Sequence, residues 1–173
     1  MKTLYLMRHA KSSWSDPALT DLERPLNPRG LRDAPEMGRR LVARGPLPQR
    51  AVSSPARRAR DTALAVLEAA GVDTALLEID ERLYFDGIEG WRSVIEDCDD
   101  AVDCLLLVGH NPDFSHFVRE LSGSLSAGGK ADLPTAALAR FELTGRWSRL
   151  QPSRIRRVEL DWPKKRQAMK PVG

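Results

Sequence analysis

The chain has 173 residues, 42% hydrophobic and 29% charged, with a formal net charge of +3. This length fits one domain with a buried core. No window approaches the ~20 apolar residues that span a membrane, and the N-terminal apolar run is too short for a signal peptide. The two cysteines, Cys98 and Cys104, make no disulfide framework, which fits a reducing compartment. We therefore expect a cytoplasmic globular protein without membrane attachment.

The positive charge is concentrated at the C-terminus. The last eleven residues contain four lysines and arginines and no acid, so the rest of the chain is nearly neutral. We interpret residues 1–162 as a single domain and 163–173 as a basic, flexible tail. A basic tail can bind nucleic acid through its phosphates, but the interpretation that we favour is a solvated terminus without a nucleic-acid partner.

The chain begins with an apolar run at residues 2–8 that is typical of a strand. A polar loop rich in turn-forming residues follows it. Asn27 and Pro28 are typical of an N-cap and a first helical position. Pro35 lies inside the pattern of the helix that follows, so the helix is expected either to kink there or to begin later.

The middle of the chain predicts a second strand at 50–53 and then the clearest helical pattern of the sequence. Ser54 is the expected N-cap of this helix, and Gly71 is its expected stop. A further strand is predicted near residues 75–79, followed by a helix over 91–98.

An uninterrupted apolar run at 104–108 predicts a strand that is covered on both faces. A helix follows it, then a surface loop over 123–134, and the alternating segments 136–143 and 155–162 predict two last strands. The alternation of strands and helices predicts an α/β fold, a three-layer sandwich with a mainly parallel central sheet flanked by helices. The last strand pair is expected to add an antiparallel edge.

Basic and imidazole side chains follow three of these strands at the point where each ends. Arg8 and His9 follow the first strand, Arg58 lies early in the helix after the second, and His110 follows the run at 104–108. The carboxyl ends of parallel strands meet at one sheet edge, where α/β proteins bind ligands. Guanidinium groups and helix N-termini both bind phosphate oxygens. The sequence therefore predicts a phosphoryl site.

Three motifs in order, LYLMRHA, SSPARRARDTA and LLVGHNP, resemble the histidine phosphatase superfamily, whose fold is that of phosphoglycerate mutase. The chain length, the segment RPLNPRG and the segment LPTAALA are similar to its short phosphohistidine phosphatase branch. The resemblance implies that His9 is the nucleophile that takes the phosphoryl group. It also implies that Arg8 and Arg58 hold the phosphate and that His110 donates to its oxygens. Arg24 is expected to approach the same anion.

The chain departs from the family pattern at three positions. Ala10 replaces the glycine of the Arg-His-Gly trio, and alanine allows a narrower range of backbone conformations. Ser15 stands where mutases have an asparagine beside the phosphate. Phe85 lies near the place of the mutase glutamate acid, so Asp86 and Glu89 are the candidate general acids. Ser12 is expected either to contact phosphate or to cap a turn.

These residues predict a phosphatase that needs no metal or other cofactor, because the guanidiniums and His110 supply the positive charge. An alkoxide leaving group needs an acid, worth about 10²- to 10⁴-fold in rate, whereas imidazole leaves more readily. The sequence therefore favours phosphohistidine of a signalling protein as substrate and inorganic phosphate as product. The alternatives are a phosphatase of small phosphate esters or anhydrides, a catalytically idle phosphate-binding module, and a metal-assisted hydrolase that uses the two histidines with carboxylates.

Overall fold

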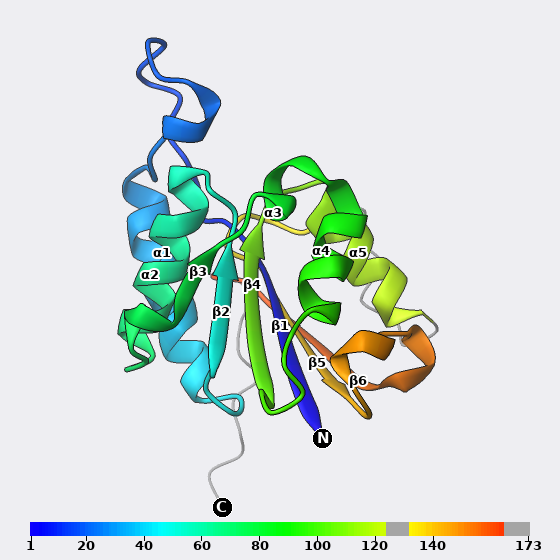
Figure 1. The fold of residues 1–173 in the computed structure, drawn as a ribbon. Helices are drawn as coiled ribbons and strands as arrows, with labels where there is room; N and C mark the ends of the chain where they lie inside the picture. Colours follow the sequence, from blue (N-terminus) through cyan, green and yellow to red (C-terminus); the bar gives the residue numbers. More distant parts are fainter. Residues whose placement is uncertain (124–131, 165–173) are drawn as a thin grey trace, which may run out of the picture.

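A computed structural model describes residues 1–123 and 132–164 as a central sheet with helices on both faces (Figure 1). The strands lie in the order β3-β2-β4-β1-β5-β6. Their bounds are β1 Lys2–Arg8, β2 Arg50–Ser53, β3 Leu77–Ile79, β4 Cys104–Gly109, β5 Leu138–Leu143 and β6 Ile155–Asp161. The α-helices are α1 Pro28–Val42, α2 Arg57–Ala69, α3 Arg82–Phe85, α4 Gly87–Glu96 and α5 Asp113–Ser122, with 3-10 turns at Asp21–Glu23, Thr74–Leu76, Trp147–Arg149 and Pro152–Arg154.

The sheet is mixed rather than mainly parallel. Strands β3, β2, β4 and β1 pair in parallel, whereas β5 pairs antiparallel with both β1 and β6. The predicted antiparallel edge is therefore confirmed, but it makes up a third of the strands. The sheet is mixed because β5 runs antiparallel to β1, and β6 then returns along β5 after residues 144–154, without the helical crossover that parallel neighbours usually need.

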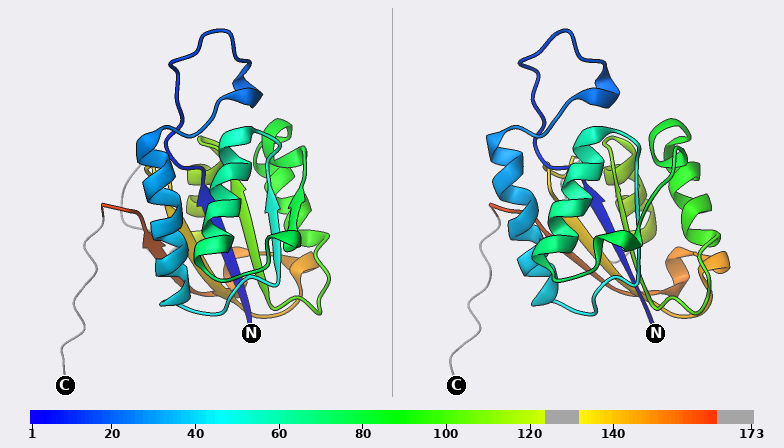
Figure 2. Two further views of the ribbon diagram at one scale, coloured as in Figure 1. Left: turned by 90° about the vertical axis from the view of Figure 1, so that its left-hand side faces the viewer. Right: turned by 60° about the vertical axis from the view of Figure 1, so that its left-hand side comes forward.

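Each central strand contributes alternate side chains to the two faces of the sheet. Leu105 and Leu107 of β4 pack with α4 and α5 residues, whereas Leu106 and Val108 pack with α1 and α2 residues. Figure 2 shows these helix pairs on opposite sides of the sheet. The apolar run at 104–108 is thus fully buried, as predicted for a strand covered on both faces.

Two helix starts differ in detail from the sequence prediction. Helix α1 begins at Pro28, where the Asn27 side chain accepts a hydrogen bond from Gly30 N at 2.9 Å, and it continues through Pro35. The alternative prediction, that this helix begins later because of Pro35, is therefore wrong. Helix α2 begins at Arg57 with Ala56 as its N-cap, so the prediction that Ser54 caps it is also wrong. The Ser54 hydroxyl accepts from the N–H of Ala56 at 3.2 Å and binds His110 Nε2 at 2.7 Å.

The parallel strands deliver their carboxyl ends to the edge of the sheet from which residues 11–27 project (Figures 1 and 2). No helix within residues 1–123 and 132–164 is long and apolar enough to cross a membrane. Most of the predicted loop at 123–134 and of the predicted tail at 163–173 lies outside the described residues.

Candidate active site

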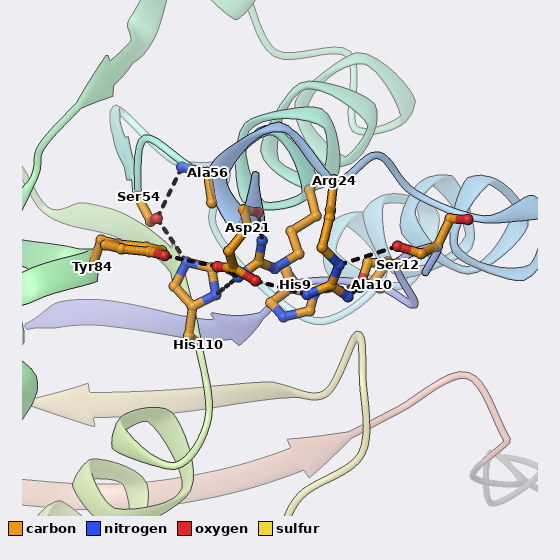
Figure 3. Close-up of polar contacts among 11 residues, drawn as sticks. His9, Ala10, Ser12, Asp21, Arg24, Ser54, Ala56, Tyr84 and His110 are labelled. Atoms are coloured by element: carbon orange, nitrogen blue, oxygen red, sulfur yellow. Dashed lines mark hydrogen bonds and ion pairs between the residues drawn. The ribbon is translucent and has the colours of Figure 1, made fainter. Parts of the chain in front are cut away.

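Three strand ends converge on one pocket of about 430 Å³. Arg8 and His9 come from the end of β1, Arg58 from the first turn of α2, and His110 from the residue after β4. Figure 3 shows the two imidazole rings side by side, with centroids 5.1 Å apart. The whole lining is Arg8, His9, Lys11, Ser12, Trp14, Arg24, Arg58, Tyr84, His110, Asn111, Pro112, Asp113 and Thr135.

The backbone of His9 is fixed on both sides. Its N–H donates to the Gly109 carbonyl at 2.9 Å, and its carbonyl accepts from Ala136 N at 3.1 Å. The ring Nδ1 lies 2.7 Å from the Ala10 carbonyl oxygen. Because a carbonyl can only accept, Nδ1 carries the hydrogen, and the neutral ring therefore has its lone pair on Nε2. The fold thus selects the tautomer with Nε2 free to act as a nucleophile.

His9 is only 9% exposed. This burial lowers the pKa of His9 to about 3, although the hydrogen bond to the Ala10 carbonyl acts in the opposite direction. The positive charges of Arg58 and Arg8 lower it further. At neutral pH the ring is therefore uncharged, as attack on phosphorus requires.

His110 is held by a hydroxyl that the sequence analysis did not include in the site. Its Nε2 lies 2.7 Å from Ser54 Oγ, and Arg58 Nη2 donates to its Nδ1 at 3.4 Å. Burial, followed by the charge of Arg58, lowers the pKa of His110 to about 4, although the charge of Asp21 opposes this shift. Two neutral imidazoles therefore face each other in a cationic pocket.

Arg8 brings a guanidinium group to the wall of the pocket. Its Nη1 donates to the Leu133 carbonyl at 2.7 Å, while its buried Nε has no hydrogen-bond partner in the described part of the chain. Burial of the guanidinium lowers its pKa. The Arg8 guanidinium thus places a positive charge, fixed by its hydrogen bond to Leu133, beside the two imidazole rings.

Arg24, which the sequence predicts to approach the anion, is buried and lines the pocket. Its Nη2 donates to Ser12 Oγ at 2.6 Å and its Nε to the Ser13 carbonyl at 3.1 Å. The indole of Trp14, which is 75% exposed, lies 3.2 Å from the guanidinium carbon of Arg24. These contacts fix a cation at the wall of the pocket.

Asp21 and Tyr84 were not anticipated from the sequence. The Asp21 carboxylate accepts from Arg58 Nη2 at 2.8 Å, from Arg24 Nη1 at 2.8 Å and from the Tyr84 hydroxyl at 2.7 Å (Figure 3). Partial burial acts to raise the pKa of this carboxyl, but the three hydrogen bonds together hold it well below its ordinary value. The only sequence signal is the three-residue spacing from Asp21 to Arg24.

Ala10 is accommodated without strain. Its N–H donates to Thr62 Oγ1 at 2.9 Å, and that hydroxyl donates to the Arg58 carbonyl at 2.6 Å. Ala136 is the only described non-glycine residue with positive φ, so Ala10 has a backbone conformation open to any residue. The methyl group is fully buried in the core. Replacement of the family glycine by alanine therefore leaves the site intact.

The remaining predicted residues divide into two groups. Ser12 lines the pocket, whereas Ser15 is exposed and pairs with the Ser13 hydroxyl at 2.8 Å. Asp86 is exposed, and the Glu89 side chain is 82% exposed beside Arg92 at 3.8 Å. The structure brings neither carboxylate into the lining of the pocket. Within residues 1–123 and 132–164, no group of three or more His, Cys, Asp or Glu side chains is placed to hold a metal.

The model of the histidine phosphatase superfamily (branch 1) matches residues 4–86, which carry Arg8, His9 and Arg58. The chain belongs to the histidine phosphatase superfamily. Among relatives of this histidine phosphatase, an uncharacterized protein of Mycobacterium tuberculosis is 36% identical over 152 residues, 84% of this chain and 92% of the relative. One of Mycobacterium leprae is 33% identical over 153 residues, with the same coverage.

Solved structures place this histidine phosphatase near the short SixA type. A protein of Nakamurella multipartitia, assigned as phosphohistidine phosphatase SixA, has a TM-score of 0.76 and 27% identity, covering 95% of this chain and 97% of that chain. A protein of Agrobacterium tumefaciens with the same assignment has a TM-score of 0.75 and 28% identity, covering 91% and 97%. Protein histidine phosphatase SixA complexed with tungstate, at 21% identity, supports the fold alone.

Proposed function

We propose that this protein is a metal-independent phosphatase that works through a phosphohistidine at His9 and removes phosphate from phosphohistidine of a signalling protein. The observation that carries the proposal is the hydrogen bond from His9 Nδ1 to the Ala10 carbonyl. It leaves a neutral Nε2 as nucleophile in a pocket lined by guanidinium groups.

The reaction has two steps. His9 Nε2 forms a bond to phosphorus while the bond to the leaving group breaks, and the leaving group departs with the electron pair. Water then attacks the phosphorus of phospho-His9, releases inorganic phosphate and restores the imidazole. Arg8, Arg58 and His110 compensate the charge on the phosphoryl oxygens, which is the main requirement of phosphoryl transfer.

The preference for phosphohistidine is based on the leaving group. A basic alkoxide needs a positioned acid, and the candidate acids Asp86 and Glu89 are both exposed outside the pocket. An imidazole that leaves from phosphohistidine needs less help. The proteins of Nakamurella multipartitia and Agrobacterium tumefaciens, assigned as phosphohistidine phosphatases, support the same substrate class.

The proposal is tested by hydrolysis of 4-nitrophenyl phosphate and of a histidine-phosphorylated protein at neutral pH with excess chelator. We expect turnover of both by the wild type, none by His9→Ala, and kcat/KM for the phosphohistidine substrate well above that for an alkyl phosphate. Loss of activity with chelator would favour the metal-assisted hydrolase, and efficient alkyl phosphate hydrolysis would favour the small-ester phosphatase. Phosphate binding without turnover would identify an idle binding module.

A further inference from the structure

Asp113 is the one carboxylate that lines the pocket within the described part of the chain. It occupies the first position of α5, three residues after His110. The residue is half-buried, and its carboxylate makes no hydrogen bond or ion pair with any described residue. A carboxylate in this position can accept a proton from a molecule in the pocket.

The other acids near the pocket are not suited to this role. The Asp21 carboxylate is occupied by three donors, which makes it a weak base. The charge of Asp132 acts to raise the pKa of Arg8, against the effect of burial. Asp132 is exposed, however, and does not line the pocket. Asp86 and Glu89 are exposed outside it.

The carboxylate of Asp113 stands next to the junction of α3 and α4. A Cβ atom on Gly87 would lie 3.9 Å from Asp113 Oδ1, which is ordinary van der Waals contact. The chain thus brings an acidic group from α5 to the wall of the pocket, next to Gly87.

We propose that Asp113 is the general base for hydrolysis of phospho-His9, an inference that rests on the proposed function. As the water oxygen forms its bond to phosphorus, the bond from phosphorus to His9 Nε2 breaks and the imidazole recovers its electron pair. The proton of the water passes to the Asp113 carboxylate, which releases it to solvent. An ionised carboxylate is sufficient for this step, whereas the first step has no need of an acid when imidazole leaves.

Removal of the base should slow the hydrolysis of phospho-His9 and leave the transfer of the phosphoryl group to His9 intact. With 4-nitrophenyl phosphate, Asp113→Asn should release one nitrophenolate per active site in a rapid burst and then turn over about 10²- to 10⁴-fold more slowly than the wild type. Phospho-His9 should accumulate as an acid-labile, alkali-stable phosphoenzyme that ³¹P NMR detects. Formate, as an external base, should restore part of the steady rate in Asp113→Ala.

Asp113 is also an acid in the first turn of a helix, where its charge stabilises the helix dipole. Glu120→Gln is the matched control, since it removes a carboxylate from the same helix outside the pocket. The control should show the kinetics of the wild type. If Asp113 has a purely structural role, Asp113→Asn should slow the burst and the steady rate equally and should accumulate no phosphoenzyme. That result would overturn the inference.

Steady turnover of Asp113→Asn within threefold of the wild type would also overturn it. If Asp113→Asn does not fold, the formate response of Asp113→Ala decides the question, and no response refutes the role. Failure of the proposed function is distinguishable, because the wild type itself would then lack turnover that depends on His9. Wild-type turnover with an unaffected Asp113→Asn would refute the base and leave the phosphatase standing.

Discussion

Asp21 binds Arg58 through two different acceptors: its carboxylate lies 2.8 Å from Arg58 Nη2, and its carbonyl oxygen lies 2.5 Å from Nη1. The two residues are 37 positions apart in the chain. This pair ties the segment that projects between β1 and α1 to helix α2, which carries the Arg58 guanidinium that we propose binds the phosphoryl group. Asp21 is thus a positioning residue for Arg58.

Asp21→Asn should therefore weaken both the fold and the activity. The substitution replaces charge-assisted hydrogen bonds to a buried guanidinium, each worth about 1.5–3 kcal/mol, by neutral ones. We expect a lower free energy of unfolding in urea and a kcat/KM about tenfold lower. Tyr84→Phe, which removes one of the three donors to Asp21, should give a smaller loss. An Asp21→Asn variant with unchanged kcat/KM would contradict this role.

The Ser54 hydroxyl can both donate to and accept from His110 Nε2. In the free protein, Arg58 donates to Nδ1, so Nε2 carries the hydrogen. When a phosphoryl oxygen approaches Nδ1, the ring must take the other tautomer, and Ser54 can then donate to Nε2. Ser54→Ala should lower kcat about tenfold with little change in KM, while Ser54→Thr should retain most activity.

The ¹⁵N shifts of the His110 ring report this role directly. In the wild type, saturating tungstate should exchange the protonated and unprotonated nitrogens. The exchange should be lost in Ser54→Ala, and its persistence there would show that the hydroxyl does not control the tautomer.

The elements that the sequence predicted best are those whose burial pattern is local. The run at 104–108 and the periodic face of α2 predict both the element and the faces that it buries. The motif also selected Arg58 over Arg57. The structure buries Arg58 in the pocket, whereas Arg57 is exposed beside Asp61 at 3.5 Å.

The features that the sequence did not predict depend on contacts between distant elements. A serine before proline is a good helix cap, and only the position of β4 shows that Ser54 binds His110 instead. Two of the three partners of the Asp21 carboxylate, Arg58 and Tyr84, come from α2 and α3, so no local spacing indicates them. The mixed sheet likewise depends on β5 pairing with β1, 131 or more residues away in the chain.

Gly109 is expected to tolerate no side chain. A Cβ atom there would lie 2.4 Å from Trp91 Cζ2, far inside van der Waals contact. Its carbonyl accepts from His9 N and its neighbour is His110, so a shift of β4 moves both histidines. Gly109→Ala should cost about 1–3 kcal/mol of stability and on the order of 10²-fold in kcat.

Trp91→Phe provides the matched test of that clash. The smaller ring removes the atoms that the new methyl group meets, so the double variant should be more stable than the sum of the two single effects predicts. Additive losses in a double-mutant cycle of unfolding free energies would show that the clash is not the cause.

The two buried histidines should make the fold sensitive to acid. In the folded chain the pKa values of His9 and His110 are about 3 and about 4, below the ordinary value of 6.5. Between pH 4 and pH 6.5 the unfolded chain therefore binds more protons than the folded chain. Stability is therefore retained above pH 6.5 and falls as the pH drops towards 4. At pH 5 each histidine should lower the free energy of unfolding by about 2 kcal/mol relative to neutral pH.

Urea unfolding at pH 7 and pH 5 measures this effect. The wild type should lose about 4 kcal/mol between the two pH values, whereas a His9→Gln, His110→Gln double variant should lose much less. His116→Gln is the control, because His116 is exposed on α5 and the variant should retain the wild-type pH dependence. Asp21 acts in a different window, since a carboxyl whose pKa is lowered on folding loses its contribution only below its ordinary pKa, near 4. Equal losses in the wild type and the double variant would therefore assign the acid sensitivity to groups other than the paired imidazoles.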